Sequence, residues 1–358
     1  MVTGTPPRAN PARDGDPVNA TPLVSVLIVT FNSTRHISAS LESLRAQDYS
    51  PLEIKIVDNA STDGTVEVLR ALEGAEVIFN SENRGFAAAQ NQAIRAAKGE
   101  WLLCLNPDVI LNDDFIRKLV SAGALDPKVG TVCGKLLRWQ PGAQPERTQI
   151  VDSTGIYFLP NLRHLDRGSE ETDSCQYDQM EYVFGATGAA ALYRRQMVED
   201  VSINGEFFDE EFSSYREDAD LAWRAQLLGW KCLYLPAAVG WHERRVTPER
   251  REELPDEINW HSVKNRFLMR AKNIGFGLWW RTTFSATLRD EIIFGYALLR
   301  NWKLLSALYY WWPMHPRGWL QKRKIIQRKR RVSDRELARW FKWKPASEPF
   351  QKSEGASG

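Results

Sequence analysis

The chain has 358 residues, of which 43% are hydrophobic and 26% are charged, and its formal net charge at pH 7 is +2. These proportions are typical of a globular protein and exclude a fibrous or wholly disordered chain. The net charge itself says little, because the charge is unevenly distributed along the sequence. The four cysteines are scattered and form no C-x-x-C pair. They indicate reduced thiols in a cytoplasmic chain rather than a disulfide framework or a zinc site.

The N-terminal part of the chain predicts an α/β architecture. Residues 1–21 are rich in Pro, Gly, Asn and Asp and lack the apolar core of a signal peptide, so we expect a disordered lead-in. After it, strand-like and helix-like segments alternate four times. Apolar runs predict strands at Val24–Thr30, at Ile54–Val57, at Val77–Phe79 and from Trp101 onward. This alternation predicts a parallel sheet with right-handed crossovers.

The fourth predicted strand leads into the most informative loop, Asn106-Pro107-Asp108. In open α/β sheets ligands bind outside the carboxyl ends of the strands, so Asp108 is expected to face a binding crevice. Hard divalent cations take oxygen ligands and often keep only one or two protein carboxylates, sharing the rest with substrate phosphates. The alternative interpretation of Asn-Pro-Asp is an ordinary turn.

The chain lacks both common phosphate-binding loops, G-x-G-x-x-G and G-x-x-x-x-G-K-[ST]. A cation held by Asp108 is the simplest way to neutralise a diphosphate without them. Asp58 and Asn59, at the end of the second strand, are candidates for hydrogen bonds to a base or ribose. The competing interpretation is a local Asx-turn.

The middle of the chain contributes three more segments. Residues 140–149 are polar and predict a loop, and residues 152–178 predict loops or edge strands around the site. The small-residue run Tyr182–Tyr193 predicts a strand in which Gly185 and Gly188 mark a bulge or a close approach to a ligand.

A helix is predicted from Asp218 to its C-cap at Gly229. Its start carries Glu217, Asp218 and Asp220, which is more acid than capping requires, so a carboxylate here is a candidate general base. Capping with surface solvation is the alternative. His242 follows a later strand end and is a candidate third ligand of the cation, although a lone histidine is more often structural.

Seven stretches occur in an order that resembles the family 2 glycosyltransferases, in particular the rhamnosyltransferase-type branch. They are VSVLIVTFNS, IVDNASTDGT, ENRGFAAAQNQAI, WLLCLNPDV, FGATGAAALYRR, FDEEFSSYREDADLAWRAQLLGW and VGWHERR. The resemblance implies an inverting enzyme with the GT-A fold for nucleotide-diphospho-sugars, a mostly parallel sheet flanked by helices. The matching stretches cover roughly residues 23–245. We expect this domain at 22–257, followed by a C-terminal helical, aromatic and basic extension at 258–345 and a disordered tail at 346–358.

The same resemblance assigns roles to individual residues. The catalytic base falls on Asp218. The metal, Mg²⁺ or Mn²⁺, falls on Asp108 of the Asp-x-Asp motif and on His242. The implied donor-binding residues are Thr30, Asn32, Asp58, Asn59, Asn83, Gly85, Asn91, Asn106 and Glu217. One departure is Asn106, which stands where the motif has its first acid and so removes one negative charge from the metal site.

The C-terminal region from Trp260 onward is basic and aromatic, but charged residues interrupt every apolar run before it reaches the length of a membrane span. Interfacial helices on an anionic membrane are the first interpretation. The alternatives are nucleic-acid binding, for which no motif is present, and a helical subdomain that packs on the catalytic domain or on a second copy.

The sequence thus predicts a metal-dependent transferase that moves a sugar, with rhamnose or another deoxy sugar favoured, from a nucleotide-diphospho-sugar to a saccharide or polyprenyl-linked acceptor. We expect a cytoplasmic protein, peripheral on the inner face of the membrane, with no nucleic-acid partner and a possible homo-oligomeric state. Two other functions remain open. One is a catalytically silent nucleotide-sugar-binding scaffold, and the other is a nucleotidyltransferase, although the first strand is not followed by the Gly-rich basic loop that the latter needs.

Overall fold

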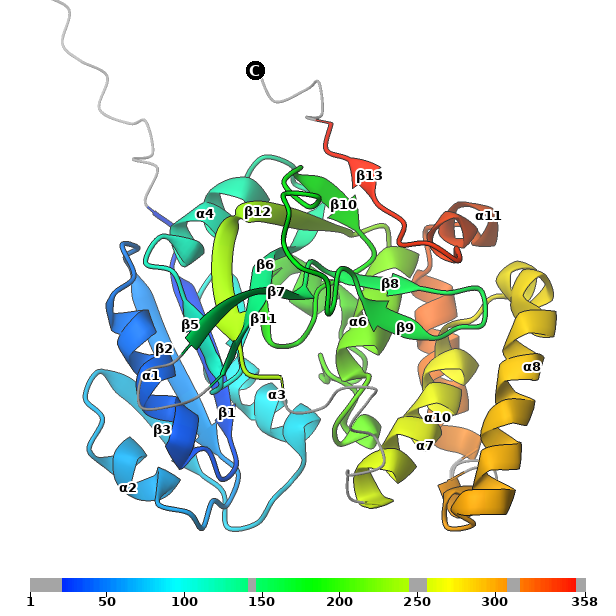
Figure 1. Cartoon of the computed structure of the whole chain (residues 1–358), viewed down its shortest axis with the longest axis horizontal. Helices are drawn as coiled ribbons and strands as arrows, with labels where there is room; N and C mark the ends of the chain where they lie inside the picture. Colours follow the sequence, from blue (N-terminus) through cyan, green and yellow to red (C-terminus); the bar gives the residue numbers. More distant parts are fainter. Residues whose placement is uncertain (1–20, 141–145, 245–255, 308–315, 352–358) are drawn as a thin grey trace, which may run out of the picture.

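The computed structural model describes residues 21–140, 146–244, 256–307 and 316–351, so the predicted N-terminal lead-in lies almost wholly outside the described residues. A large sheet runs through the molecule, with helices packed on it and a group of C-terminal helices beyond one end (Figure 1). The strands are β1 Val24–Thr30, β2 Leu52–Asp58, β3 Ala75–Phe79, β4 Trp101–Leu105, β5 Val109–Leu111, β6 Val129–Gln140, β7 Glu146–Ser153, β8 Ile156–Phe158, β9 His164–Asp166, β10 Glu181–Val183, β11 Ala190–Arg194, β12 Lys231–His242 and β13 Glu348–Pro349.

The helices follow the same chain order. They are α1 Thr34–Arg45, α2 Thr65–Arg70, α3 Phe86–Ala96, α4 Phe115–Gly123, α5 Arg195–Val201, the 3₁₀ turn η1 Glu210–Phe212, α6 Glu217–Leu227, α7 Asp256–Asn273, α8 Phe276–Arg300, α10 Pro316–Lys329, α11 Asp334–Leu337 and the 3₁₀ turn η3 Ala338–Trp340.

The predicted parallel sheet is confirmed for the N-terminal half. The strand order is β13-β10-β12-β6-β11-β4-β1-β2-β3, and β1 pairs in parallel with both β2 and β4. β1 is buried at all seven positions because both faces of the sheet are covered, which explains its unbroken apolar run. The sheet turns mixed at β11, which runs antiparallel between β4 and β6. The α/β class with helices flanking the sheet is therefore correct.

Two sequence interpretations of the middle region were wrong. The stretch 140–149 is not a plain loop, since β6 reaches Gln140 and β7 begins at Glu146 and pairs antiparallel with it. The run 182–193 is not one strand, since β10 ends at Val183 and β11 begins at Ala190. Gly185 lies in this interruption, where a Cβ would be 2.3 Å from the Cβ of Ala222 on α6. The close approach is to a helix of this chain.

The C-terminal helices belong to the same hydrophobic core as the sheet. Leu268 of α7, Leu278 of α8 and Ile326 of α10 are buried and join the main core cluster. The disordered tail expected from 346 does not hold for its first residues, because Glu348–Pro349 pairs with β10 at the sheet edge. Within the described part of the chain, no helix combines the length and the apolar character that a membrane span needs.

Candidate active site

The loop after β4 lies at the centre of the sheet, between the ends of β1 and β11. The backbone N–H of Asn106 donates to the carbonyl of Ala189, at 2.8 Å. The carbonyl of Asp108 accepts from the indole of Trp139 at 2.9 Å and from the backbone N–H of Glu243 at 3.1 Å. The Asp108 backbone is thus fixed by β6 and by the residue that follows β12.

His242, the last residue of β12, lies beside Asp108. Its Nε2 lies 3.5 Å from Asp108 Oδ1, and its Nδ1 lies 2.8 Å from Oδ2 of Asp152 on β7. Asp152 is fully buried. Burial alone would lower the pKa of His242, but the charges of Asp152 and Asp108 outweigh it and raise this pKa to about 10.

This geometry suits a divalent cation, although no group of three or more His, Cys, Asp or Glu side chains in the described residues is arranged to hold one. Mg²⁺ and Mn²⁺ need only one or two protein ligands when substrate phosphates and water supply the rest. A metal-bound histidine normally donates its other ring N–H to a carboxylate, which is the place that Asp152 occupies beside His242. Asp108 and His242 therefore fit as the protein ligands once a cation replaces the proton on Nε2 of His242, and Asp152 would orient the imidazole through Nδ1.

The candidate base, Asp218, and the loop that bears Asp108 are hydrogen-bonded to the same short segment of backbone, residues 188 and 189. Asp218, in the first turn of α6, accepts a hydrogen bond from the N–H of Gly188 at 3.1 Å. Gly188 is followed by Ala189, whose carbonyl is bonded to Asn106. The loop that bears Asp108 and the candidate base are thus attached to adjacent residues.

Two acids at the start of α6 have perturbed ionisation. Burial, reinforced by the charge of Asp166, raises the pKa of Asp218, while the Arg244 guanidinium acts in the opposite direction. Burial and the neighbouring Asp218 raise the pKa of Glu217 to about 8. A buried carboxylate with a raised pKa is a better proton acceptor than an exposed one, which suits a general base.

Arg244 connects the two halves of the site. Its guanidinium lies 3.5 Å from Asp152 and pairs with Asp166 of β9. The sequence contained Arg244 within VGWHERR, but no pattern indicated that it would lie between the support of His242 and the surroundings of Asp218. Asp152, Asp166 and Arg244 were all missed by sequence reasoning.

Two hydrogen-bond networks line the strand ends at the predicted nucleoside side. In the first, Asp58 accepts from the hydroxyls of Thr30 at 2.9 Å and Ser61 at 2.6 Å, and Asn32 Oδ1 accepts from the N–H of Thr62 at 2.8 Å. Asp58 also accepts from the N–H of Ser61 at 3.0 Å, a bond within the loop after β2. Buried Thr30 and Asp58 therefore shape this loop, while partly exposed Asn32 lies at its surface.

The second network holds the loop after β3. The amide of Asn59 donates to Asn83 at 2.7 Å and accepts from the side chain of Asn80 at 3.1 Å. Gly85 has φ +81°, and a Cβ there would lie 2.6 Å from the Ser213 hydroxyl, so glycine is required by backbone and space. Of this group, Asn83 is exposed.

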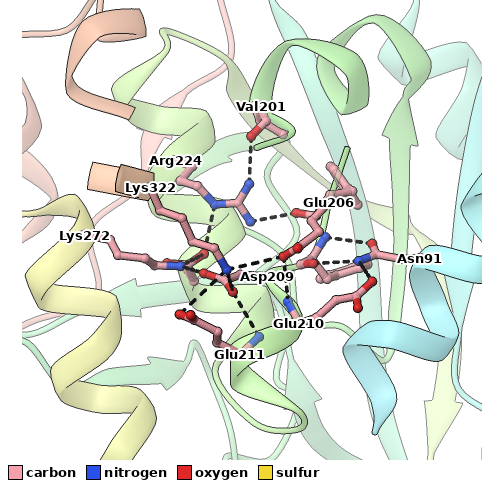
Figure 2. Close-up of polar contacts among 12 residues, drawn as sticks. Asn91, Val201, Glu206, Asp209, Glu210, Glu211, Arg224, Lys272 and Lys322 are labelled. Carbon is pink, nitrogen blue, oxygen red and sulfur yellow. Dashed lines mark hydrogen bonds and ion pairs between the residues drawn. The ribbon is translucent and has the colours of Figure 1, made fainter. Parts of the chain in front are cut away.

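Asn91 has a role in packing that the sequence did not suggest. It is buried, its amide donates to the carbonyl of Phe208 at 2.8 Å, and it accepts from the N–H of Phe208 at 3.0 Å. These bonds hold the segment before η1 (Figure 2). Both ends of the Asn91 amide are therefore engaged within the protein, and a contact of this residue with the donor stays a prediction.

The C-terminal helices fix the segment that leads into α6 and the candidate base. Ser213, Tyr215 and Arg216, just before α6, all have positive φ, between 60° and 71°. Such a strained segment persists only when its surroundings fix it. Asn265 of α7 does so, because its buried amide lies 2.8–2.9 Å from the carbonyls of Phe212, Ser214 and Tyr215.

A buried charge network also ties α6 to the C-terminal helices (Figure 2). Lys272 of α7 pairs with Asp209 and with Asp220 of α6, and Lys322 of α10 also pairs with Asp209. Asp220 in turn pairs with Arg224 at 2.9 Å. The sequence left Asp220 open as a candidate base or as a solvated capping residue, but its charge is fully buried within this network.

A cavity of about 840 Å³ lies elsewhere, at the sheet edge formed by β10 and β13. Tyr182, Gln226 and Arg339 are among its lining residues, and none of the predicted site residues lines it. The candidate site is therefore defined by its convergent side chains, not by this cavity.

Solved structures define the class to which this fold belongs. The crystal structure of GalNAc-T7 with UDP, GalNAc and Mn²⁺ is similar, with a TM-score of 0.55, 14% identity, and coverage of 70% of this chain and 49% of that one. The mannosyltransferase PcManGT from Pyrobaculum calidifontis, in complex with GDP-Man and Mn²⁺, gives a TM-score of 0.51 at 19% identity, covering 87% and 86%. At these identities the likeness shows the fold alone, which is that of the GT-A glycosyltransferases.

The family follows from sequence comparison. The model of glycosyl transferase family 2 matches residues 25–202, so the chain contains a domain of this family. One relative is poly-beta-1,6-N-acetyl-D-glucosamine synthase of Staphylococcus aureus (strain COL), 25% identical over 251 residues. The match covers 69% of this chain but only 56% of that protein. Another is N-acetylglucosaminyl-diphospho-decaprenol L-rhamnosyltransferase of Mycobacterium tuberculosis (strain CDC 1551 / Oshkosh), 25% identical over 290 residues, covering 76% and 91%.

Proposed function

We propose that this glycosyltransferase is an inverting enzyme that transfers a sugar from a nucleotide-diphospho-sugar to an acceptor hydroxyl. The observation that carries the proposal is the connection of Asp218 and Asn106 to adjacent residues, Gly188 and Ala189. It brings a half-buried carboxylate with a raised pKa beside the loop that bears Asp108.

The proposed reaction is a single displacement. Asp218 accepts the proton of the acceptor hydroxyl while that oxygen forms a bond to the anomeric carbon. The bond from this carbon to the diphosphate breaks on the opposite side, and the diphosphate leaves with the electron pair. Asp108 and His242 would hold Mg²⁺ or Mn²⁺ with the donor. When bound, the cation supplies positive charge that stabilises the departing diphosphate.

The remaining site residues bind and orient. Asp152 keeps His242 turned toward Asp108, and the loops shaped by Asp58 and Asn59 would hold the nucleoside. Asn106 in place of an acid leaves Asp108 as the acid of this loop, so the diphosphate itself would contribute more to metal binding. Protonated Glu217, with its raised pKa, would avoid a second negative charge beside the base.

The substrate proposal rests on the relatives. The mycobacterial relative, whose length is nearly covered, is named for rhamnosyl transfer to a decaprenyl-diphosphate-linked sugar. The staphylococcal relative is named for synthesis of a polysaccharide. We infer a donor carrying rhamnose or another deoxy sugar, a saccharide or polyprenyl-linked acceptor, and work at the inner face of the membrane in cell-surface polysaccharide or cell-wall glycan assembly.

The proposal is tested by Asp218→Asn, which keeps the shape of the side chain but cannot accept the proton. Transfer should fall about 100- to 10,000-fold, the usual contribution of positioned base catalysis. Metal-dependent binding of the donor, measured by thermal shift, should change little. Asp114→Asn at the start of α4, outside the site, is the matched control and should retain the parent rate.

Two outcomes would contradict the proposal. Transfer by Asp218→Asn at a substantial fraction of the parent rate would exclude Asp218 as the base. A parent protein that binds nucleotide-sugars but transfers to no saccharide or lipid-linked acceptor would instead support a silent scaffold.

A further inference from the structure

The outer side of α8 is mostly apolar, with exposed Glu291 among its apolar residues. Phe276, Trp280, Phe284, Leu288, Ile292 and Leu299, which we call the outer α8 face, are between 56% and 85% exposed. The first five follow one another at intervals of four residues, so they lie on one side of the helix. Single exposed apolar residues are ordinary in proteins, but a continuous patch of this kind marks an interaction surface.

The helix that bears this face is firmly attached to the protein. Its inner side carries buried Leu278, Thr282 and Ala286. Asp290 pairs with Arg266 and Arg270 of α7, at 3.0 and 2.5 Å. The outer α8 face is therefore held in place without a partner of its own in the described structure, at the end of the molecule opposite β3 (Figure 1).

The sequence that follows this face is strongly basic. From residue 292 to residue 333 the sequence has ten Lys and Arg residues and no Asp or Glu. Exposed Arg281 and Arg300 also flank the apolar residues on α8 itself. Two copies packed face to face across α8 would bring these basic segments together, and like charges oppose such contact. An anionic lipid surface, in contrast, complements both the apolar face and the bases.

We propose that the outer α8 face is a membrane-docking surface that lies in the interface of an anionic bilayer, parallel to it. Tryptophan and phenylalanine enter the boundary between headgroups and acyl chains, while flanking arginines pair with lipid phosphates. The basic helix α10 is not the docking element, because Lys322 is buried in ion pairs and Ile326 joins the main core.

The position of α8 relates this surface to the acceptor, a step that rests on the proposed function. The Ser285 hydroxyl of α8 donates to the carbonyl of Pro160 at 2.8 Å, in the turn between β8 and β9. On β9, His164 lies 3.0 Å from Arg216, which directly precedes Glu217 and Asp218. The β8–β9 hairpin thus contacts both α8 and the residue that precedes the acids at the start of α6. A bilayer against α8 would present a lipid-linked glycan as the acceptor.

The test uses the full chain and vesicles of phosphatidylglycerol and phosphatidylcholine in equal parts, with pure phosphatidylcholine for comparison. The double variant Trp280→Ser/Phe284→Ser removes two side chains that are 71% and 83% exposed, so folding should be retained. The matched control is Phe79→Ser/Leu125→Ser, which removes exposed apolar residues from β3 and from the segment just after α4. Binding is measured by flotation at low salt, and unfolding by circular dichroism.

We expect the parent and the control to float with the anionic vesicles, and the α8 variant to bind at least about tenfold more weakly. Parent binding should also weaken as salt is added. Equal binding of parent and α8 variant, or no binding by the parent, would overturn the proposal. So would a parent dimer that becomes monomeric in the α8 variant without any vesicle binding, since the occupant would then be a second copy.

The result is separable from the proposed function. Asp218→Asn should float like the parent, and the α8 variant should keep its donor-dependent thermal stabilisation. Loss of transfer in Asp218→Asn with no vesicle binding by any protein would uphold the enzyme and remove only the docking surface.

Discussion

Asp152 offers the sharpest test of how the site is built, because it touches the predicted metal ligand and not the metal. Asp152→Asn keeps the size of the side chain and an oxygen that can accept the Nδ1 hydrogen of His242. In the parent, Nδ1 of His242 lies 2.8 Å from Oδ2 of Asp152. The substitution removes the negative charge that holds His242 turned toward Asp108. Partners of this kind typically contribute 10- to 100-fold in metal affinity. That corresponds to about 1.4–2.7 kcal/mol.

The measurement is a calorimetric titration of Mn²⁺ into the protein saturated with dTDP, the nucleotide expected if the donor is dTDP-rhamnose. The melting temperature without metal is recorded beside it. The second measurement is needed because Arg138 and Arg244 lie 3.6 and 3.5 Å from Asp152 and lose part of their charge compensation. We expect the Kd for Mn²⁺ to rise about 10- to 100-fold in Asp152→Asn. Asp108→Ala serves as the reference for loss of a direct ligand and should weaken binding further.

A folded Asp152→Asn protein that binds Mn²⁺ as tightly as the parent would refute this role for Asp152. A lower melting temperature with unchanged Mn²⁺ affinity would give Asp152 a role in stability alone. The same loss of dTDP affinity with and without metal would point to distortion of the nucleotide loops instead.

Two further predictions concern buried charge. Glu217, with a folded-state pKa of about 8 against an ordinary value of 4.5, binds its proton more tightly in the folded protein, so it lowers stability as pH rises from 4.5 through 8. Glu217→Gln should remove this pH dependence. The free energy of unfolding of the variant should exceed that of the parent by an amount that grows from pH 5 to pH 8.5, reaching on the order of a few kcal/mol in urea titrations. Plots of unfolding free energy against pH that run parallel for the two proteins would contradict the prediction. Lys272→Met should destabilise the protein by about 3–5 kcal/mol, because Asp209 and Asp220 would stay buried with less compensation. Urea denaturation measures this, with exposed Lys303→Met as the control, and an effect no larger than the control's would show that the network is dispensable.

The sequence predicted the half of the site that depends on strand ends. Buried parallel strands such as β1 and β4 appear as unbroken apolar runs, so the residues just after them, including Asp108, could be placed at one edge of the sheet from the sequence alone. The start of α6 was also predictable from the sequence. The apolar residues recur with helical periodicity and Gly229 marks the end of the helix, so Asp218 falls in its first turn.

The support of these residues was not predictable, because it comes from pairings distant in sequence. Asp152 lies on β7, a strand that pairs with β6 and has no strong alternation, and it contacts a histidine 90 residues later. Arg244 and Asp166 approach each other from beyond β12 and from β9. Such contacts are fixed by how strands assemble and leave no periodic signal in a single sequence.

The C-terminal helices are likewise more closely tied to the site than their sequence indicated. A helical extension after residue 257 suggested an appendage, yet α7 carries Asn265, whose amide holds the three carbonyls ahead of α6. Lys272 of the same helix neutralises Asp220, two residues after the proposed base. Without α7, the strained backbone at Tyr215 and Arg216 would lose what fixes it, and Asp220 would lose one of its charge partners. The geometry of Asp218 therefore depends on helices that contain none of the family's sequence motifs, and an enzyme cut after β12 should lack an ordered base.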